Sequence, residues 1–172
     1  LEEMSKKVYL WVELGLQTIN DKTAENFNRG YKFEVFKEGI KKLQDRGIEV
    51  VVHSIFGLPG ETKEDMLRTI DYIAHSGAQG IKFHLLHLMK NTKMAEQYYN
   101  GEFELLSEED YIDLICQGIS MIPEEMVVHR LTGDAPRATL IGPMWSLKKW
   151  EVLNAIDKAL VDRDIWQGKN FK

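Results

Sequence analysis

The chain has 172 residues, of which 44% are hydrophobic and 28% charged, and its net charge is −5. One domain with a hydrophobic core is expected, and the acidic balance argues against a broad basic surface for nucleic acid. The single cysteine, Cys116, excludes a disulfide framework and any iron–sulfur cluster held by several thiolates of this chain. Because no apolar run reaches the about 18 residues of a membrane helix, and the first residues do not resemble a signal peptide, we expect no membrane partner and a cytoplasmic location.

Three short apolar segments in the first half of the chain predict buried strands. Residues 8–14 form the first and Gly15 ends it, residues 48–56 form the second, and residues 81–88 form the third. Helices are predicted between them, over residues 33–46 and after Thr62. Strands that alternate with helices at this spacing predict an α/β fold with a parallel sheet.

The second half of the chain is less regular. Its predicted elements are a short helix, a longer helix, a short strand and a last helix, at residues 93–99, 107–121, 127–131 and 144–162. Two helix starts carry capping signals, because Thr62 is followed by Asp65 and Ser107 by Asp110, three residues on in each case.

Polar side chains lie at or near the carboxyl ends of the predicted strands, where parallel sheets bind ligands. These residues are Glu13, Gln17, His53 and His84. Each of them taken alone is equally well explained as a hydrogen-bonded polar group of the core.

Two further features have an ordinary structural explanation. Residues 57–62, with the sequence GLPGET, join a strand to a helix N-terminus and are best explained as a tight turn, although such a loop also suits an anion or a carbonyl group. The doublet Lys148 and Lys149 is interpreted as a solvated helix face rather than as a nucleic-acid patch.

The motifs in combination are more specific than any one of them. Residues 13–18 (ELGLQT), 29–31 (RGY) and 53–62 (HSIFGLPGET) resemble the second half of radical S-adenosylmethionine (radical SAM) enzymes. The branch that they resemble contains oxygen-independent coproporphyrinogen oxidase and the elongator catalytic subunit. Within it, three more segments resemble the bacterial YtqA/YhcC group: residues 82–87 (KFHLLH), 130–136 (RLTGDAP) and 166–169 (WQGK). The resemblance covers essentially the whole chain.

The resemblance implies the C-terminal half of a partial (β/α)6 barrel of the TIM type. Residues 1–172 would form a single domain that begins at the fourth barrel strand and carries a C-terminal α/β extension from about residue 107. By the same resemblance, Gln17 and Arg29 contact the amino-acid end of S-adenosylmethionine, and Glu13 contacts its ammonium group or a ribose hydroxyl.

The resemblance also implies cofactor contacts on the next two strands, and one of these positions departs from the family pattern. The coproporphyrinogen oxidase branch has an aspartate where this chain has His53, so His53 contacts the cofactor, faces the substrate or is a core donor. The stretch around Leu86 and His87 is expected to wall the adenine.

The family's first half carries three cysteines, spaced Cys-x3-Cys-x2-Cys, that hold a 4Fe-4S cluster. This chain lacks them, and Cys116 is interpreted as a small buried hydrophobic residue. The chain therefore resembles a C-terminal fragment of a larger enzyme, with no metal site of its own, and is expected to be inactive alone. Without a neighbour for residues 8–14, the first strand predicts a dimer through its exposed edge.

For the parent enzyme, the resemblance implies one-electron reduction of S-adenosylmethionine and hydrogen abstraction from the substrate by a 5′-deoxyadenosyl radical. The YtqA resemblance suggests the wobble uridine of tRNA as substrate. The candidate substrate-side residues are Lys82, His84, His129, Arg130 and Asp134. The segment from Arg130 to Asp134 is equally well explained as an ion-paired structural loop. The alternatives are a radical SAM enzyme acting on a small or porphyrin-like molecule, and a non-catalytic α/β binding domain.

Overall fold

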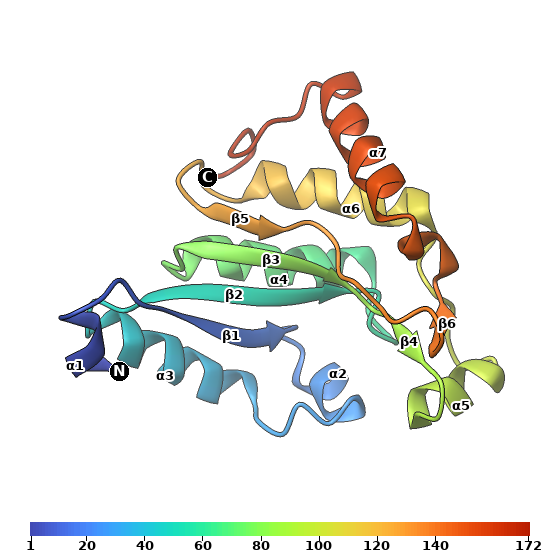
Figure 1. Ribbon diagram of the computed structural model, residues 1–172, viewed down its shortest axis with the longest axis horizontal. Helices are drawn as coiled ribbons and strands as arrows, with labels where there is room; N and C mark the ends of the chain where they lie inside the picture. The colour runs from blue at the N-terminus through green and yellow to red at the C-terminus, as the bar shows by residue number, and fades with distance from the viewer.

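The computed structural model describes residues 1–172, and its centre is a four-stranded parallel sheet (Figure 1). The strand order is β1-β2-β3-β5, and the strands are β1 (Trp11–Gln17), β2 (Glu49–Phe56), β3 (Gly80–Leu85) and β5 (Val127–Arg130). A second, antiparallel sheet pairs β4 (Leu88–Met89) with β6 (Leu140–Gly142). The expected α/β fold class is confirmed.

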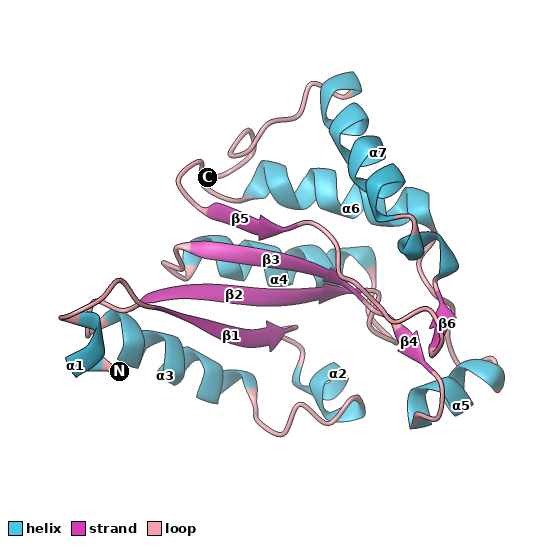
Figure 2. Cartoon of the chain, viewed as in Figure 1, coloured by secondary structure: helices cyan, strands magenta, loops and turns pink.

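Seven α-helices and one 3-10 helix accompany the two sheets and leave one face of the larger sheet uncovered (Figure 2). They are α1 (Glu2–Ser5), α2 (Asp21–Asn26), α3 (Phe33–Gln44), α4 (Lys63–His75), α5 (Lys93–Tyr99), α6 (Glu108–Met121), the 3-10 helix η1 (Met144–Leu147) and α7 (Lys149–Asp162). Both predicted caps are confirmed: Thr62 and Asp65 form a reciprocal capping box at α4, and the Ser107 side chain accepts a hydrogen bond from the Asp110 N–H at α6. No helix is both long enough and apolar enough to cross a bilayer.

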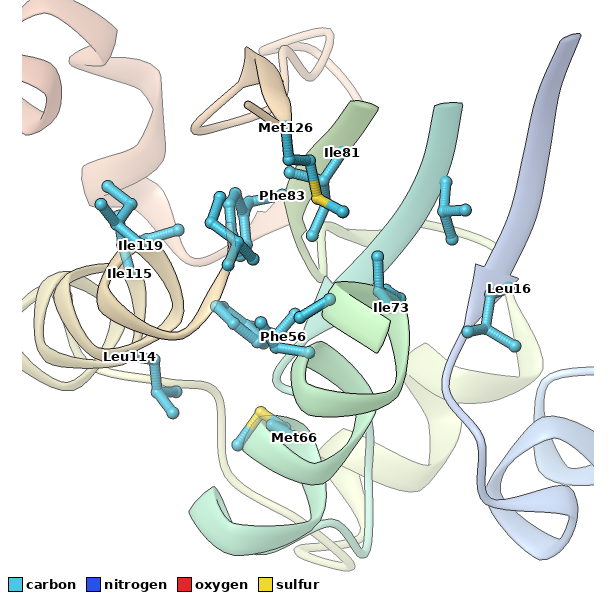
Figure 3. Close-up of a cluster of buried hydrophobic side chains, with 14 of the residues drawn as sticks. Leu16, Phe56, Met66, Ile73, Ile81, Phe83, Leu114, Ile115, Ile119 and Met126 are labelled. Atoms are coloured by element: carbon cyan, nitrogen blue, oxygen red, sulfur yellow. The ribbon is translucent and has the colours of Figure 1, made fainter. Parts of the chain in front are cut away.

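The hydrophobic core lies between one face of the sheet and helices α3, α4 and α6 (Figure 3). It includes Phe56 of β2, Phe83 of β3 and Ile73 of α4, all of them fully buried. Helix α6 approaches the sheet closely, because a Cβ on Gly118 would lie only 2.9 Å from the Phe83 ring. Helix α7 packs on α6 and adds Val152 to the same core.

The opposite face of the sheet carries polar and aromatic side chains that stay partly exposed. We call it the open face, and its residues are Trp11, Glu13, His53, Lys82, His84 and His129. Parallel sheets are normally covered on both faces. The open face is therefore where a ligand or further polypeptide can pack.

Three predicted boundaries are wrong. Strand β1 begins at Trp11 instead of residue 8, and it passes through Gly15 to Gln17. The third strand ends at Leu85, and Leu88 starts the separate strand β4. The last helix is broken at Lys148, whose backbone is not helical, and only α7 follows it as an α-helix.

The exposed edge of the sheet lies where it was expected. Strand β1 pairs only with β2 and so forms one edge of the four-stranded sheet. A dimer through this edge stays a prediction, as does the division of the chain near residue 107.

Candidate functional site

Gln17 ends β1 in an unusual conformation that aims its side chain back over the strand. Its φ is 59°, and the β1–β2 register shifts between Gly15 and Gln17. A Cβ on Gly15 would collide with the Gln17 Nε2, so only glycine leaves room for this carboxamide. The Gln17 Oε1 is buried and has no hydrogen-bond partner. An acceptor is therefore available at the predicted cofactor contact.

Arg29 holds the backbone on both sides of Gln17. Its Nη1 donates to the carbonyl oxygens of Leu16, at 2.9 Å, and Thr18, at 2.6 Å. Its Nε donates to the Tyr31 carbonyl at 2.9 Å, and its Nη2 bonds Asp21 Oδ1 at 3.1 Å. The side chain is 2% exposed. Arg29 thus lies beside Gln17, as predicted, but most of its donors already serve the fold; direct contact with a cofactor stays a prediction.

A charged cluster joins three neighbouring strands on the open face. The Lys82 Nζ donates to Glu13 Oε2 at 2.5 Å, and the His53 Nε2 lies 2.8 Å from the same oxygen. The hydrogen bond from Lys82, aided by His53, lowers the pKa of Glu13 to about 2. Burial lowers the pKa of His53, although Glu13 opposes that shift. At neutral pH the cluster therefore pairs a carboxylate with an ammonium group.

His84 continues this cluster toward β5. Its ring lies 5.1 Å from the His53 ring at an interplanar angle of 30°. Burial, reinforced by electrostatic repulsion from His53, Arg130 and Lys82, lowers the pKa of His84 to about 4. Its Nε2 is buried without a partner. A neutral imidazole with a free nitrogen can donate or accept one hydrogen bond to a ligand.

Removing the ammonium group of this cluster is expected to change how stability depends on pH. Ionised Glu13 stabilises the fold above its usual pKa of 4.5, and that contribution is lost as pH falls toward 2. Lys82→Met removes the largest cause of the low Glu13 pKa, so between pH 4.5 and pH 2 the variant should lose less stability than the wild type does. Urea unfolding at several pH values measures it, with exposed Lys22→Met as the matched control. The same pH dependence in Lys82→Met and wild type would contradict the assignment.

The loop of residues 57–62 bonds several of its polar groups within the protein, although the buried Glu61 Oε2 has no partner. Thr18, which is buried, donates a hydrogen bond to Glu61, and burial raises the pKa of Glu61. The Gly57 N–H points at the Met66 sulfur, 3.0 Å away, and Gly57 has a φ of 88°. The loop therefore ties the end of β1 to the end of β2, which supports the tight-turn interpretation.

Leu86 and His87 lie between β3 and β4, where they border a cavity of about 300 Å³. Phe27 and Asn28 beyond α2, and residues of α5, line its other sides. The His87 Nε2 is buried without a partner, and burial lowers the pKa of His87. The two residues are thus available to a ligand, and their contact with adenine stays a prediction.

Two of the predicted substrate-side residues, His129 and Asp134, follow β3 in the chain and have different surroundings. His129 lies over Gly80, where a Cβ would come within 2.7 Å of the imidazole, and its ring is 6.5 Å from that of Trp11. Asp134 is ion-paired, with both carboxylate oxygens 2.9 Å from the Lys149 Nζ. Lys149 is therefore not the purely solvated residue that was expected. The pair supports the structural-loop interpretation for Asp134.

The chain does not supply ligands for an iron–sulfur cluster. Cys116 is fully buried in α6, where burial raises the pKa of its thiol, as expected of a small hydrophobic residue. No group of three or more His, Cys, Asp or Glu side chains is placed to hold a metal ion.

Some residues of the site were missed from the sequence. Asp21 anchors Arg29 and also accepts a hydrogen bond from the Phe33 N–H at 2.6 Å. A signal for its helix was present, because Asn20 caps α2 by accepting from the N–H groups of Lys22 and Thr23. The ion pair between Glu13 and Lys82 was also missed.

Similarity to known proteins extends over nearly the whole chain. Residues 1–73 match the radical SAM superfamily, and residues 78–162 match the radical SAM C-terminal domain. YtqA of Bacillus subtilis (strain 168) is 50% identical over 172 residues, which are 100% of this chain and 53% of that protein. A tRNA uridine(34) acetyltransferase of Methanocaldococcus jannaschii is 26% identical over 144 residues, 82% of this chain and 27% of that protein.

The fold has a counterpart among solved structures. The archaeal Elp3 of Methanocaldococcus infernus superposes with a TM-score of 0.82 at 21% identity, over 96% of this chain and 39% of that chain. The chain spans about half the length of YtqA. Two matches to one superfamily, in sequence order and over most of the residues, agree with the predicted fold and motifs. The chain therefore belongs to the radical SAM superfamily.

Proposed function

We propose that this chain forms the cofactor-contacting and substrate-facing part of a radical SAM enzyme that modifies the wobble uridine of tRNA. The observation that carries the proposal is the end of β1, where Arg29 fixes the backbone around Gln17 while the Gln17 Oε1 stays buried and unpartnered. A side chain held in place with a free acceptor suits a bound polar ligand better than it suits a core.

The residues present fit S-adenosylmethionine. Its ammonium group and ribose hydroxyls are donors that suit the Gln17 carboxamide oxygen and the Glu13 carboxylate, which lie two pleats apart on β1. Leu86 and His87, which line the neighbouring cavity, would contact the adenine. When bound, S-adenosylmethionine supplies the one-electron chemistry that removes a hydrogen atom from the substrate in this superfamily. The role of this chain is then to bind and orient it.

The open face supplies the substrate side of the proposal. Lys82, which is ion-paired with Glu13, presents a positive group, and His84 adds a neutral imidazole. A positive group beside an uncharged hydrogen-bonding group suits a substrate that carries a carboxylate, as a carboxymethylaminomethyl-uridine does. The M. jannaschii relative is a tRNA uridine(34) acetyltransferase, which supports the same substrate class.

The decisive test is the nucleoside content of tRNA from a strain that lacks the gene. We expect liquid chromatography with mass spectrometry to show loss of one modified wobble uridine and accumulation of its precursor. Expression of the wild-type gene should restore the profile. An unchanged profile would overturn the tRNA assignment and leave a small-molecule substrate or a binding role for the domain.

A further inference from the structure

A pocket of about 400 Å³ lies between β5 and the start of α7, beside the open face. Its charged lining residues, Arg130 and Lys149, are both basic, and His129 and Thr132 add further polar groups. No acidic residue lines it, although the protein as a whole carries a net charge of −5. A basic pocket in an acidic protein suits an anion.

Two side chains of this pocket are without partners. Arg130 is exposed, and its guanidinium forms no ion pair or hydrogen bond within the protein, in contrast to Lys149. Thr132 is only 1% exposed, and its Oγ1 forms no hydrogen bond of good geometry; it lies beside the buried Tyr111 hydroxyl, which donates to the Leu131 carbonyl at 2.7 Å. The Thr132 hydroxyl can donate to a ligand that offers a better acceptor.

The start of α7 borders the pocket, which Lys149 and Leu153 line, although the Glu151 N–H of its first turn already donates to the Lys148 carbonyl at 2.8 Å. Helix α7 begins at Lys149, and Lys148 at the N-cap position offers no side-chain acceptor to the first turn. The free N–H groups and positive dipole of a helix N-terminus favour a phosphate. A phosphate has enough oxygen atoms to accept from a guanidinium, a hydroxyl and a helix N-terminus together.

Asp134 opposes an anion at this place. Its carboxylate holds Lys149 at 2.9 Å and offsets that positive charge, so Arg130 is the free cation of the pocket. An incoming anion would have to compete with Asp134 for Lys149. Removal of the Asp134 carboxylate should therefore strengthen anion binding, whereas removal of the Arg130 guanidinium should weaken it.

The sheet register connects the pocket to the reacting side of the molecule. Arg130 of β5 lies opposite Lys82 of β3 in the strand register, and Lys82 is hydrogen-bonded to Glu13 on the open face. We propose that the pocket between β5 and α7 binds a phosphate group, and that in the tRNA substrate this is a backbone phosphate near the modified nucleoside. The tRNA part of the inference rests on the proposed function.

The first experiment measures the salt dependence of tRNA binding. Fluorescein-labelled tRNA is titrated with the 172-residue chain at several salt concentrations, and the slope of log K against log[salt] is compared between variants. Arg130→Ala should lower the magnitude of the slope by about 0.7–0.9, the value for one phosphate contact. Lys158→Ala, which removes a positive charge of α7 outside the pocket, should leave the slope unchanged. Equal slopes for wild type and Arg130→Ala would overturn the tRNA part.

The second experiment tests whether the negative charge of Asp134 weakens tRNA binding. Asp134→Asn frees Lys149 from its ion pair, so tRNA should bind several-fold more tightly. Thermal unfolding of each variant confirms that it is folded. Binding that is unchanged or weaker in Asp134→Asn would show that the pair with Lys149 is structural only, and would count against the site.

A third arm uses inorganic phosphate alone and separates the two sources of the ligand. Phosphate should shift the NMR signals of Thr132 in the wild type, and Arg130→Ala should abolish the shift. Phosphate binding without an effect of Arg130→Ala on the tRNA slope would assign the pocket to a free phosphate compound. The absence of phosphate binding in the wild type would overturn the site itself. The tRNA profile of the deletion strain tests the proposed function separately.

Discussion

Replacement of Arg29 by methionine is expected to lower the free energy of unfolding by about 1–3 kcal/mol, the usual cost of leaving a buried polar group without its hydrogen-bond partner. Methionine keeps much of the apolar stem but none of the donors. The carbonyl oxygens of Leu16 and Thr18 would then lose their hydrogen bonds to the guanidinium, and Asp21 would lose its cation. The side chain is only 2% exposed, so water does not readily replace it.

Urea unfolding measures this effect, with Arg46→Met as the matched control. The Arg46 side chain is 49% exposed, so its removal should change stability by less than about 0.5 kcal/mol. Arg29→Lys should fall between the two, because one ammonium group cannot span the two carbonyls and Asp21 together. A loss in Arg29→Met no larger than that in Arg46→Met would contradict the structural role. Such a result would favour an arginine kept for direct contact with the cofactor.

The role of Arg29 shows where sequence reasoning stops. The resemblance to radical SAM enzymes placed Arg29 near the cofactor, and the structure places it beside Gln17. Three of its four hydrogen bonds end on backbone carbonyls, which carry no mark in the sequence. Only the structure distinguishes a residue that binds the ligand from a neighbouring residue that positions it.

The elements predicted best are those whose signals are local. Strand β2 and helix α4 have strong periodicity, and the capping box between Thr62 and Asp65 sets the start of the helix. Strand β1 was misplaced because residues 8–10 have strand-like composition but no partner. Its pairing begins where Trp11 lies opposite Glu49, the first residue of β2.

The remaining errors come from contacts between residues far apart in the chain. Leu88 continues an apolar run, but it pairs antiparallel with Gly142, so the run divides into β3 and β4. No periodicity within the run marks that division. The ion pair between Glu13 and Lys82 depends on the register of three strands, which the sequence does not state.

Gly15→Ala is expected to reduce the cofactor-dependent activity about tenfold or more with little change in stability. The new Cβ collides with the end of the Gln17 side chain, which can move away, so the fold tolerates the change. The carboxamide is then displaced from its place over the strand and loses one hydrogen bond to a charged ligand, worth about 1.5–3 kcal/mol. Gly39→Ala is the matched control, because nothing lies within 4 Å of its added Cβ.

Two measurements separate function from folding in this variant. The first is the amount of modified wobble uridine in the deletion strain when the variant gene is expressed at a limiting level. The second is thermal unfolding of the purified chain. Loss of the modified nucleoside together with a large drop in melting temperature would show a folding defect and sink the interpretation. Gly39→Ala should restore the nucleoside fully, and as a glycine-to-alanine change within a helix it should raise stability by about 0.5–1 kcal/mol.

A double-variant comparison then decides whether Gly15 acts through Gln17. Gln17→Asn shortens the carboxamide but keeps a residue that tolerates the left-handed backbone at this position, where φ is 59°. If the glycine serves only to make room for the carboxamide, the double variant should lose no more activity than either single variant does. Residues that contact each other show this non-additivity, whereas independent sites give losses that multiply. Multiplying losses would mean that Gly15 serves the cofactor by close backbone approach instead, with Gln17 acting separately.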